Sequence, residues 1–287
     1  MVKFKPKIVG ILNLTPDSFS DGGKYFDEEK ALFHLEKMLL SGADIVDIGA
    51  ESTRPNAQIL SAQEEISRLE NILPKLILAI KNFNKIHHKN IQASIDSYHF
   101  ETIIFAHEIG VEIINDVSGL IDEKIIDYIA QNNLTAILMH NLAIHSNPDL
   151  IVNRDLNVVE EIINWAQQKI DFLTSRKIQK SQLIFDPGIG FAKNSTQSIR
   201  ILKNINAFRV LNLPIYVGHS KKSFLDALNI PLQPNLDRTA KTLILSQYLA
   251  QKNVDYLRVH DVKENLEAIN FEKFEKNFFN HFKYIFD

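Results

Sequence analysis

The chain has 287 residues, of which 45% are hydrophobic and 23% charged, and it contains no cysteine. The absence of cysteine excludes disulfides, thiol nucleophiles, iron–sulfur clusters and cysteine-type zinc sites. The 32 Lys and Arg against 35 Asp and Glu leave a formal net charge of −3, which gives no reason to expect nucleic acid or a membrane as a partner. The sequence has no recognisable signal peptide and no run of ~20 apolar residues. We therefore expect a cytoplasmic globular protein.

Eight short apolar segments recur along the chain and are interpreted as β-strands. They are rich in Ile, Val and Leu, and several are apolar throughout, which is typical of strands buried on both faces of a parallel sheet. The expected strands are 7–13, 43–49, 91–96, 112–117, 134–139, 183–186, 214–218 and 255–259.

Segments with helical periodicity separate these strands. Among them are 28–40, 62–83, 158–173 and 237–249. Ser41-Gly42 is expected to end the first, because glycine is favoured just beyond a helix C-terminus. Alternating strands and helices predict βαβ units. Eight such units in roughly 250 residues is the count of a (β/α)8 TIM barrel.

No linker, low-complexity tract or repeat divides the chain, so a single domain over 1–287 is expected, with the barrel at about 7–270. The remainder, 271–287, carries phenylalanines at helical spacing and predicts an amphipathic terminal helix. That helix would either pack on the barrel or form a homodimer contact. The aromatic positions are Phe271, Phe274, Phe278, Phe282 and Phe286.

Each predicted strand leads into hydrogen-bonding or charged residues. The carboxyl ends of the strands of a (β/α)8 barrel lie on one face, and this face holds the active site. A single Asn or Asp at a strand end is more often a turn or a helix cap, but eight polar ends together favour a site. In chain order, the polar residues include Asn13, Glu51, Asp96, Asn115, His140, Asp186, Lys222 and Arg258.

Three of these residues, Asp96, Asn115 and Asp186, follow the third, fourth and sixth strands and are expected to converge. Carboxylates beside an amide suit a flat polar heterocycle with amino and ring N–H donors. They would also suit a metal, although the asparagine and the distance between the strands argue against a tight cage.

Cationic residues gather after the seventh and eighth strands, where barrels of this kind frequently bind phosphate. Such groups favour an anion, so the sequence predicts a heterocycle that carries a phosphate-type group. Taken alone, Lys221 and Lys222 would be interpreted as a solvent-exposed pair. The cations are Lys221, Lys222, Arg258 and His260.

Other motifs carry less information. Gly188-Ile189-Gly190 lacks the spacing and the acidic residue of a dinucleotide-binding loop. His140 and His145 could form a zinc pair only with a third ligand that the sequence does not offer.

Eight segments together resemble the dihydropteroate synthases. The resemblance runs in order from about residue 8 to 263. It implies a transferase that condenses 6-hydroxymethyl-7,8-dihydropterin diphosphate with p-aminobenzoate. The products are 7,8-dihydropteroate and diphosphate, on the folate biosynthesis path, and sulfonamides imitate p-aminobenzoate in this family. The segments are GILNLTPDSFSDGG (10–23), GAESTRP (49–55), IDS (95–97), INDVSGL (114–120), LMH (138–140), DPGIGFAKN (186–194), VGHSKKSF (217–224) and RVHDV (258–262).

The resemblance assigns roles to individual residues. It places Asp96, Asn115, Met139, Asp186 and Lys222 in the pterin-binding set. It places Asn13, Arg258 and His260 in the diphosphate set, with Asn13 also contacting Mg²⁺, the implied cofactor. The p-aminobenzoate set is Phe19, Thr53, Arg54, Pro55, Phe191, Ser220 and Lys222. Two loops, 14–26 and 50–60, are expected to close over the site, and Phe19 and Asp21 belong to the first. The implied catalytic residues are Asp96, Asp21, Lys222, Arg258 and His260.

The family's reaction is implied to be dissociative and SN1-like. Mg²⁺, Arg258 and His260 would offset the charge that develops on the diphosphate. Asp96 and Asp21 would stabilise the pterin cation electrostatically. The amine of p-aminobenzoate is a neutral nucleophile, so no strong general base is required.

Three positions depart from the commoner family pattern. Asn56 and Ala192 stand where glycine is common, and Lys221 stands where arginine is common. None of them removes an implied catalytic contact.

Two alternatives remain open to the sequence. A methyltetrahydrofolate-type methyltransferase would not need Thr53, Arg54 and Pro55, nor Lys222 together with Ser220. A catalytically silent pterin-binding paralogue would be expected to have lost part of the diphosphate set, and all of that set is present.

Overall fold

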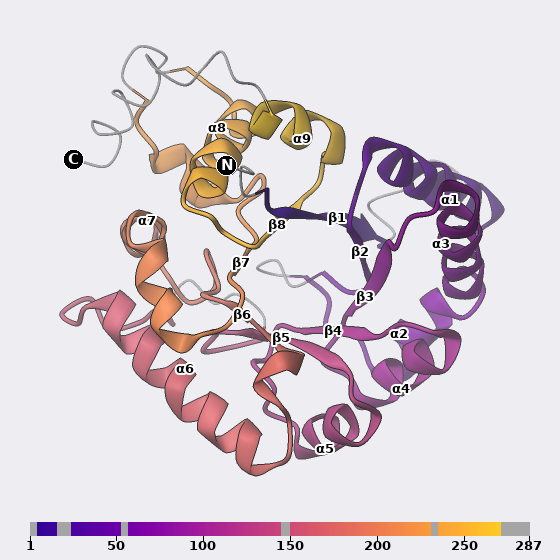
Figure 1. Ribbon diagram of the computed structural model, residues 1–287, viewed down its shortest axis with the longest axis horizontal. Helices are drawn as coiled ribbons and strands as arrows, with labels where there is room; N and C mark the ends of the chain where they lie inside the picture. The colour runs from indigo at the N-terminus through magenta and orange to yellow at the C-terminus, as the bar shows by residue number, and fades with distance from the viewer. Residues whose placement is uncertain (1–4, 16–23, 53–56, 145–149, 231–234, 271–287) are drawn as a thin grey trace.

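Eight parallel strands form a ring at the centre of the computed structural model, and helices surround it (Figure 1). The structure describes residues 5–15, 24–52, 57–144, 150–230 and 235–270. Hydrogen bonds join the strands in the order β6-β5-β4-β3-β2-β1-β8-β7. Between the two ends of this order, the Phe185 N–H donates to Pro214 O over 2.9 Å. The strands are β1 (Lys7–Asn13), β2 (Ile45–Gly49), β3 (Gln92–Asp96), β4 (Ile113–Asp116), β5 (Thr135–Met139), β6 (Leu183–Asp186), β7 (Tyr216–Val217) and β8 (Tyr256–Val259).

The helices follow the strands in chain order and lie on the outside of the ring. The (β/α)8 barrel is therefore confirmed, and each expected strand is found within about two residues of its predicted bounds. The α-helices are α1 (Lys24–Ser41), α2 (Ala62–Leu69), α3 (Leu73–His87), α4 (Phe100–Ile109), α5 (Glu123–Asn132), α6 (Val158–Ser175), α7 (Ser195–Lys203), α8 (Arg238–Gln251) and α9 (Val262–Asn270). Short 3₁₀ helices complete them at η2 (Lys180–Gln182), η3 (Ile205–Leu211) and η4 (Ser223–Ala227).

The segment 62–83, predicted from its helical periodicity, is helical but is divided into two helices. The segment forms α2 and α3, and Pro74 lies in the first turn of α3. Proline has no N–H to continue the hydrogen bonds of a preceding helix, but it is tolerated where a new helix starts. Gly42 follows α1 with a φ of +94°, which confirms the predicted end of that helix. The helix expected over 271–287 lies outside the described residues.

Two apolar layers hold the barrel together. The larger layer lies between the strands and the helices and includes Leu12, Leu35 and Phe185, all of them fully buried. The smaller layer fills the inside of the ring, where one side chain comes from each of six strands: Val9, Ile45, Ile113, Ile137, Ile184 and Tyr216. The inside of the ring is therefore packed with side chains, and any site must lie above this layer.

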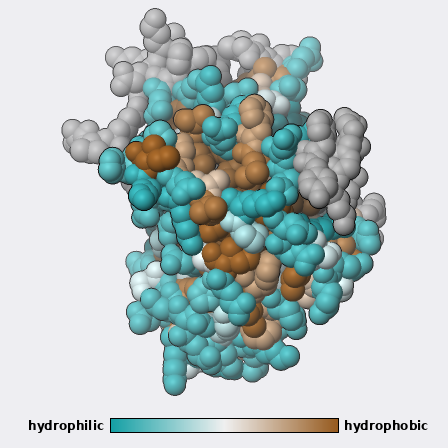
Figure 2. Space-filling view, turned by 90° about the vertical axis from the view of Figure 1, so that its right-hand side faces the viewer, coloured by the Kyte–Doolittle hydropathy of each residue, from teal (hydrophilic) through white to brown (hydrophobic). Residues whose placement is uncertain are grey.

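The outer surface mixes hydrophilic and apolar side chains on the face that carries α1 and α3 (Figure 2). Phe33 and Leu40 on α1 and Leu78 and Ile86 on α3 are among the exposed large hydrophobic residues. No helix in the described part of the chain is long and apolar enough to cross a membrane.

Candidate active site

A polar layer lies directly above the apolar layer inside the barrel. Side chains two residues apart on a strand point to the same face. Ile45 is therefore followed by Asp47, Ile113 by Asn115 and Ile184 by Asp186. On β8, Tyr256 is likewise followed by Arg258, while Asp96 on β3 pairs in register with Asn115. The strand pattern that fills the lower barrel with apolar groups thus places charged groups at the carboxyl ends.

Asp47 is the centre of this layer, although the sequence did not mark it as a site residue. Its carboxylate is fully buried and accepts hydrogen bonds from Ser94 Oγ at 2.5 Å and Asn115 Nδ2 at 2.9 Å. It also accepts one from Arg258 Nε at 2.6 Å. One signal could have found it: Asp47 is a charged residue in the middle of an otherwise apolar strand, in phase with the inward-facing residues.

Arg258 connects Asp47 to Asp96. Its Nη2 donates to Asp96 Oδ2 over 2.6 Å, while its Nε donates to Asp47. Burial raises the pKa of Asp96 to about 7, and the negative charge of Asp47 adds to this rise while Arg258 opposes it. Asp96 is therefore a carboxylate that titrates close to neutral pH. The sequence placed Arg258 in the anion-binding set; the two ion pairs use two of its five N–H groups and leave the others available to an anion.

A cavity of about 570 Å³ opens above this layer, at the carboxyl ends of the strands. Seven of the predicted site residues line it, and they come from five separate segments of the chain. They are Asn13, Asp96, Phe191, Ser220, Lys222, Arg258 and His260.

Lys222 and Phe191 form one wall of the cavity. The Lys222 ammonium lies 4.5 Å from the centre of the Phe191 ring and donates to Ile189 O over 2.5 Å. Burial lowers the pKa of Lys222 to about 8, and the charge of Arg258 adds to this effect while Asp186 opposes it. A cation beside an aromatic ring can bind a flat anionic ligand. The aromatic ring of the protein stacks on the ligand, and the ammonium pairs with the ligand's negative charge.

Ser220 and His260 are in contact, although the sequence assigned them to different substrates. Ser220 Oγ is 2.9 Å from His260 Nδ1. The sequence placed the serine with p-aminobenzoate and the histidine with diphosphate. Their contact makes the two predicted subsites contiguous.

Three further predicted residues, Asn115, Met139 and Asp186, are buried at the strand ends beneath the cavity. Met139 and Asp186 are register partners on β5 and β6. Asp186 Oδ1 accepts from the Gly188 N–H at 2.7 Å. Burial raises the pKa of Asp186, and Lys222 is the main opposing charge.

Five predicted residues lie outside the described residues, and the structure therefore does not place them: Asp21, Phe19, Thr53, Arg54 and Pro55. Glu51 and Ser52, which precede three of them, line the cavity. Glu51 accepts a hydrogen bond from the Tyr98 hydroxyl at 2.8 Å and lies 3.2 Å from His99 Nε2. The loop 50–60 therefore starts at the edge of the cavity, where hydrogen bonding fixes the Glu51 carboxylate.

His140 is the described half of the histidine pair, and a lysine lies against its ring. Its Nδ1 lies 2.8 Å from the ammonium of Lys193. Among the residues that the structure describes, no group of three or more His, Cys, Asp or Glu could hold a metal ion. His145 lies outside the described residues.

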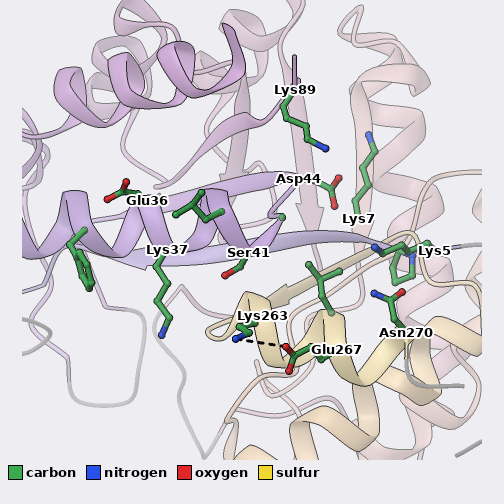
Figure 3. A pocket seen from close by; sticks show the side chains of 15 residues that line it. Lys5, Lys7, Glu36, Lys37, Ser41, Asp44, Lys89, Lys263, Glu267 and Asn270 are labelled. Carbon is green, nitrogen blue, oxygen red and sulfur yellow. Dashed lines mark ion pairs between the residues drawn. The ribbon is translucent and has the colours of Figure 1, made fainter. Parts of the chain in front are cut away.

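A second hollow, of about 940 Å³, lies at the other end of the barrel (Figure 3). Lysines such as Lys5, Lys7 and Lys89 line it, and Lys263 pairs with Glu267 at 3.9 Å. Lys5 and Lys7 are at the amino-terminal end of β1, whereas the active sites of barrels lie at the carboxyl ends. The smaller cavity above Asp47 is therefore the candidate active site.

Comparisons with known proteins identify relatives of this chain. The model of the pterin binding enzyme family matches residues 9–260. A dihydropteroate synthase from Clostridium beijerinckii is 38% identical over 263 residues, covering 91% of each chain. A dihydropteroate synthase from Streptococcus pyogenes is 39% identical over 270 residues, covering 91% of this chain and 92% of the relative. The chain belongs to the dihydropteroate synthase family.

Solved structures of this family share the fold. The dihydropteroate synthase of Anaplasma phagocytophilum with bound 6-hydroxymethylpterin-monophosphate has a TM-score of 0.80 and 38% identity, covering 92% of this chain and 97% of its own. That of Yersinia pestis in complex with a sulfonamide drug has a TM-score of 0.79 and 32% identity, covering 94% of each chain. The resemblance stated from the sequence motifs is confirmed.

Proposed function

We propose that this chain condenses 6-hydroxymethyl-7,8-dihydropterin diphosphate with p-aminobenzoate to give 7,8-dihydropteroate and diphosphate. The chain is a transferase of the dihydropteroate synthase family. The observation that carries the assignment is the cavity above Asp47, where seven residues predicted for three subsites face one space. A methyltransferase or a silent paralogue would not require all three subsites to be kept.

The pterin is placed against the polar layer inside the barrel. An ionised Asp96 accepts from the amino and ring N–H groups of the heterocycle, and the buried Asp186 and Asn115 offer further polar atoms beneath it. Asp96 is held by Arg258 in the structure, so the pterin competes with that guanidinium for the same carboxylate. The remaining N–H groups of Arg258 are then available to the phosphate groups.

The diphosphate is placed at the side of the cavity that Arg258 and His260 line. Both groups can donate to an oxyanion, and such donors stabilise the charge that develops on a departing diphosphate. Ser220 contacts His260 Nδ1 and sets the orientation of its ring, so Nε2 is the atom that can face an anion.

Magnesium is part of this proposal and fits the donors on this side. Mg²⁺ usually binds through one or two protein oxygens and completes its shell with waters and substrate phosphates. The Asn13 amide, at the end of β1 and on the cavity wall, is such an oxygen donor. When bound, the ion would offset negative charge on the diphosphate.

p-Aminobenzoate is placed between Phe191 and Lys222, with the loop residues Thr53, Arg54 and Pro55 completing its site. The aromatic ring stacks on Phe191, and the carboxylate pairs with nearby cations. A neutral aromatic amine needs no strong base to attack a pterin cation, which the Asp96 carboxylate stabilises electrostatically. Closure of the loops that contain Asp21 and Thr53 would exclude water, which would otherwise hydrolyse the cation.

The proposal also includes a cytoplasmic location and a homodimer. The lack of cysteine in all 287 residues suits a reducing compartment. The phenylalanines of 271–287 recur at helical spacing in the sequence, and we propose that this segment contacts a second copy. Sedimentation of a chain truncated near residue 270 tests the dimer: a monomer supports the role of this segment, and an unchanged dimer contradicts it.

Diphosphate release with p-aminobenzoate present or omitted tests the function. The purified chain is given Mg²⁺ and the pterin diphosphate, and release is followed in a coupled assay. Turnover that depends on p-aminobenzoate supports the proposal. Absence of that dependence contradicts it.

A further inference from the structure

We propose that Lys193 is a positioning residue that fixes the segment 186–194 so that Phe191 presents its ring to the p-aminobenzoate site. This inference rests on the proposed function, because the proposed function places p-aminobenzoate against Phe191. Lys193 is itself only 7% exposed and does not line the cavity. It acts through the loop and does not touch substrate.

The Lys193 ammonium is surrounded by three acceptors. Its Nζ lies 2.8 Å from His140 Nδ1, 3.1 Å from His140 O and 2.8 Å from Phe191 O. A charged lysine has three N–H donors and no acceptor. The number of donors and the number of acceptors therefore match, and the Phe191 carbonyl is one of the three.

The ring of His140 is suited to receive this ammonium. Burial, together with the charge of Lys193, lowers the pKa of His140 to about 2, so the imidazole stays neutral. A neutral imidazole has one donor and one acceptor nitrogen. With Lys193 donating to Nδ1, the ring proton is on Nε2.

The loop needs an anchor because its backbone is unusual. Gly188, Gly190 and Ala192 all have a positive φ, at +68°, +78° and +49°. A Cβ added at Gly188 would lie 2.0 Å from His140 O, so the loop is in close contact with the end of β5. His140 therefore holds the loop twice, once through this contact and once through Lys193.

Two lysines thus contact Phe191, one at its ring and one at its backbone carbonyl. Lys222, which lines the cavity, contacts the Phe191 ring and Ile189 O. Lys193, which is buried, contacts Phe191 O. A substrate carboxylate can draw Lys222 away from the loop, whereas the bonds of Lys193 are out of its reach. The permanent anchor is therefore Lys193.

The charged groups around Lys193 are Asp186 and Lys222. Burial lowers the pKa of Lys193 to about 7, Lys222 adds to the effect, and Asp186 opposes it. Loss of one proton removes one of the three donors. We therefore expect the KM for p-aminobenzoate to rise above neutral pH as the anchor weakens.

The first test separates the two Michaelis constants. Lys193→Met removes the donors and keeps the length of the side chain. We expect the KM for p-aminobenzoate to rise at least tenfold and the KM for the pterin diphosphate to change less than twofold. Lys180→Met, at an exposed lysine, is the matched control and leaves both constants unchanged. Equal rises in both constants, or no rise, would overturn the role.

Two further variants show that the effect passes through the ammonium and through Phe191. The chain has no cysteine, so Lys193→Cys can be aminoethylated at one position in denaturant and refolded, which restores an ammonium. We expect this product to regain the p-aminobenzoate KM; no recovery contradicts the role of the charge. In a Phe191→Leu background, Lys193→Met should have little additional effect on KM. A full additional effect contradicts the route through Phe191.

The contact itself can be tested without a substitution. Nitrogen NMR of the ¹⁵N-histidine-labelled chain reports which ring nitrogen of His140 carries the proton. An Nε2–H tautomer that persists to pH 5 supports the anchor, and a protonated Nδ1 overturns it. This result is independent of turnover. If the unsubstituted chain shows no p-aminobenzoate-dependent activity, the proposed function fails; activity with unchanged constants in Lys193→Met defeats the Lys193 proposal alone.

Discussion

Replacing Asp47 by asparagine removes one negative charge from the centre of the polar layer and keeps the size of the side chain. The asparagine oxygen can still accept from Arg258 and Asn115, and its amide can donate to the Ser94 hydroxyl, which can rotate to accept. What is lost is the charge that strengthens the bond to Arg258, a bond of 2.6 Å in a buried environment. Hydrogen bonds to charged groups contribute about 1.5–3 kcal/mol. An ordinary hydrogen bond contributes about 0.5–1.5 kcal/mol, and the asparagine retains one, so we expect the free energy of unfolding to fall by about 1 kcal/mol.

The larger effect should be on Asp96. The charge of Asp47 raises the pKa of Asp96, and Arg258 lowers it while being shared between the two carboxylates. In Asp47→Asn the negative charge of residue 47 is gone, and Asp96 is the one carboxylate that still pairs with Arg258. Both changes lower the pKa of Asp96. Neighbouring charges typically shift a carboxyl pKa by about 1–3 units. We expect a fall of at least about one unit from the present value of about 7.

The pH profile of kcat/KM for the pterin diphosphate measures this shift. Only the ionised Asp96 holds the heterocycle and stabilises its cation, so activity should decline as pH falls through about 7. In Asp47→Asn the decline should begin at least one unit lower. The substrate titrates identically with both enzymes, so the difference belongs to the protein. Asp155→Asn, at an exposed carboxylate, is the control. An unmoved or raised midpoint in Asp47→Asn would refute the reasoning.

Three further predictions concern Asp96, Lys222 and Ala192. Asp96→Asn should keep the fold, by circular dichroism and unfolding, and lower turnover at least tenfold; near-normal turnover would remove its role toward the cation. Lys222→Ala should raise the Michaelis constants of both substrates, because its ammonium contacts the Phe191 ring and its charge interacts with that of Asp186; unchanged constants would refute the double role. Ala192 has a φ of +49°, a left-handed conformation that costs an alanine about 1–2 kcal/mol, whereas the greater freedom of glycine in the unfolded chain costs about 0.5–1 kcal/mol. Ala192→Gly should therefore raise the free energy of unfolding, measured in urea, by about 0.5–1 kcal/mol. A less stable variant would contradict this.

The strands could be predicted from the sequence because burial on both faces produces continuous apolar segments. The division of 62–83 was missed because its apolar pattern continues across the break and only Pro74 marks it. The short β7 is found at Tyr216–Val217, inside the predicted 214–218. Edges of elements depend on hydrogen bonds between strands, which the pattern of one strand does not contain.

The site was partly predictable for a similar reason. Polar residues at the strand ends are visible in the sequence, and one cavity brings six of them together with Phe191. Asp47 was missed because it lies within a strand and becomes informative only once the inward face is known. The pairing of Arg258 with Asp47 joins residues 211 positions apart, and that of Lys193 with His140 joins residues 53 apart. Such pairs follow from the closure of the barrel, which local patterns do not specify.

Product identification tests the central claim most directly. The chain is incubated with Mg²⁺, the pterin diphosphate and p-aminobenzoate, and both products are quantified by mass spectrometry and a diphosphate assay. The account predicts one 7,8-dihydropteroate for each diphosphate released, and a loss of both products in Arg258→Ala. Diphosphate released without 7,8-dihydropteroate, or unchanged product formation in Arg258→Ala, would contradict it.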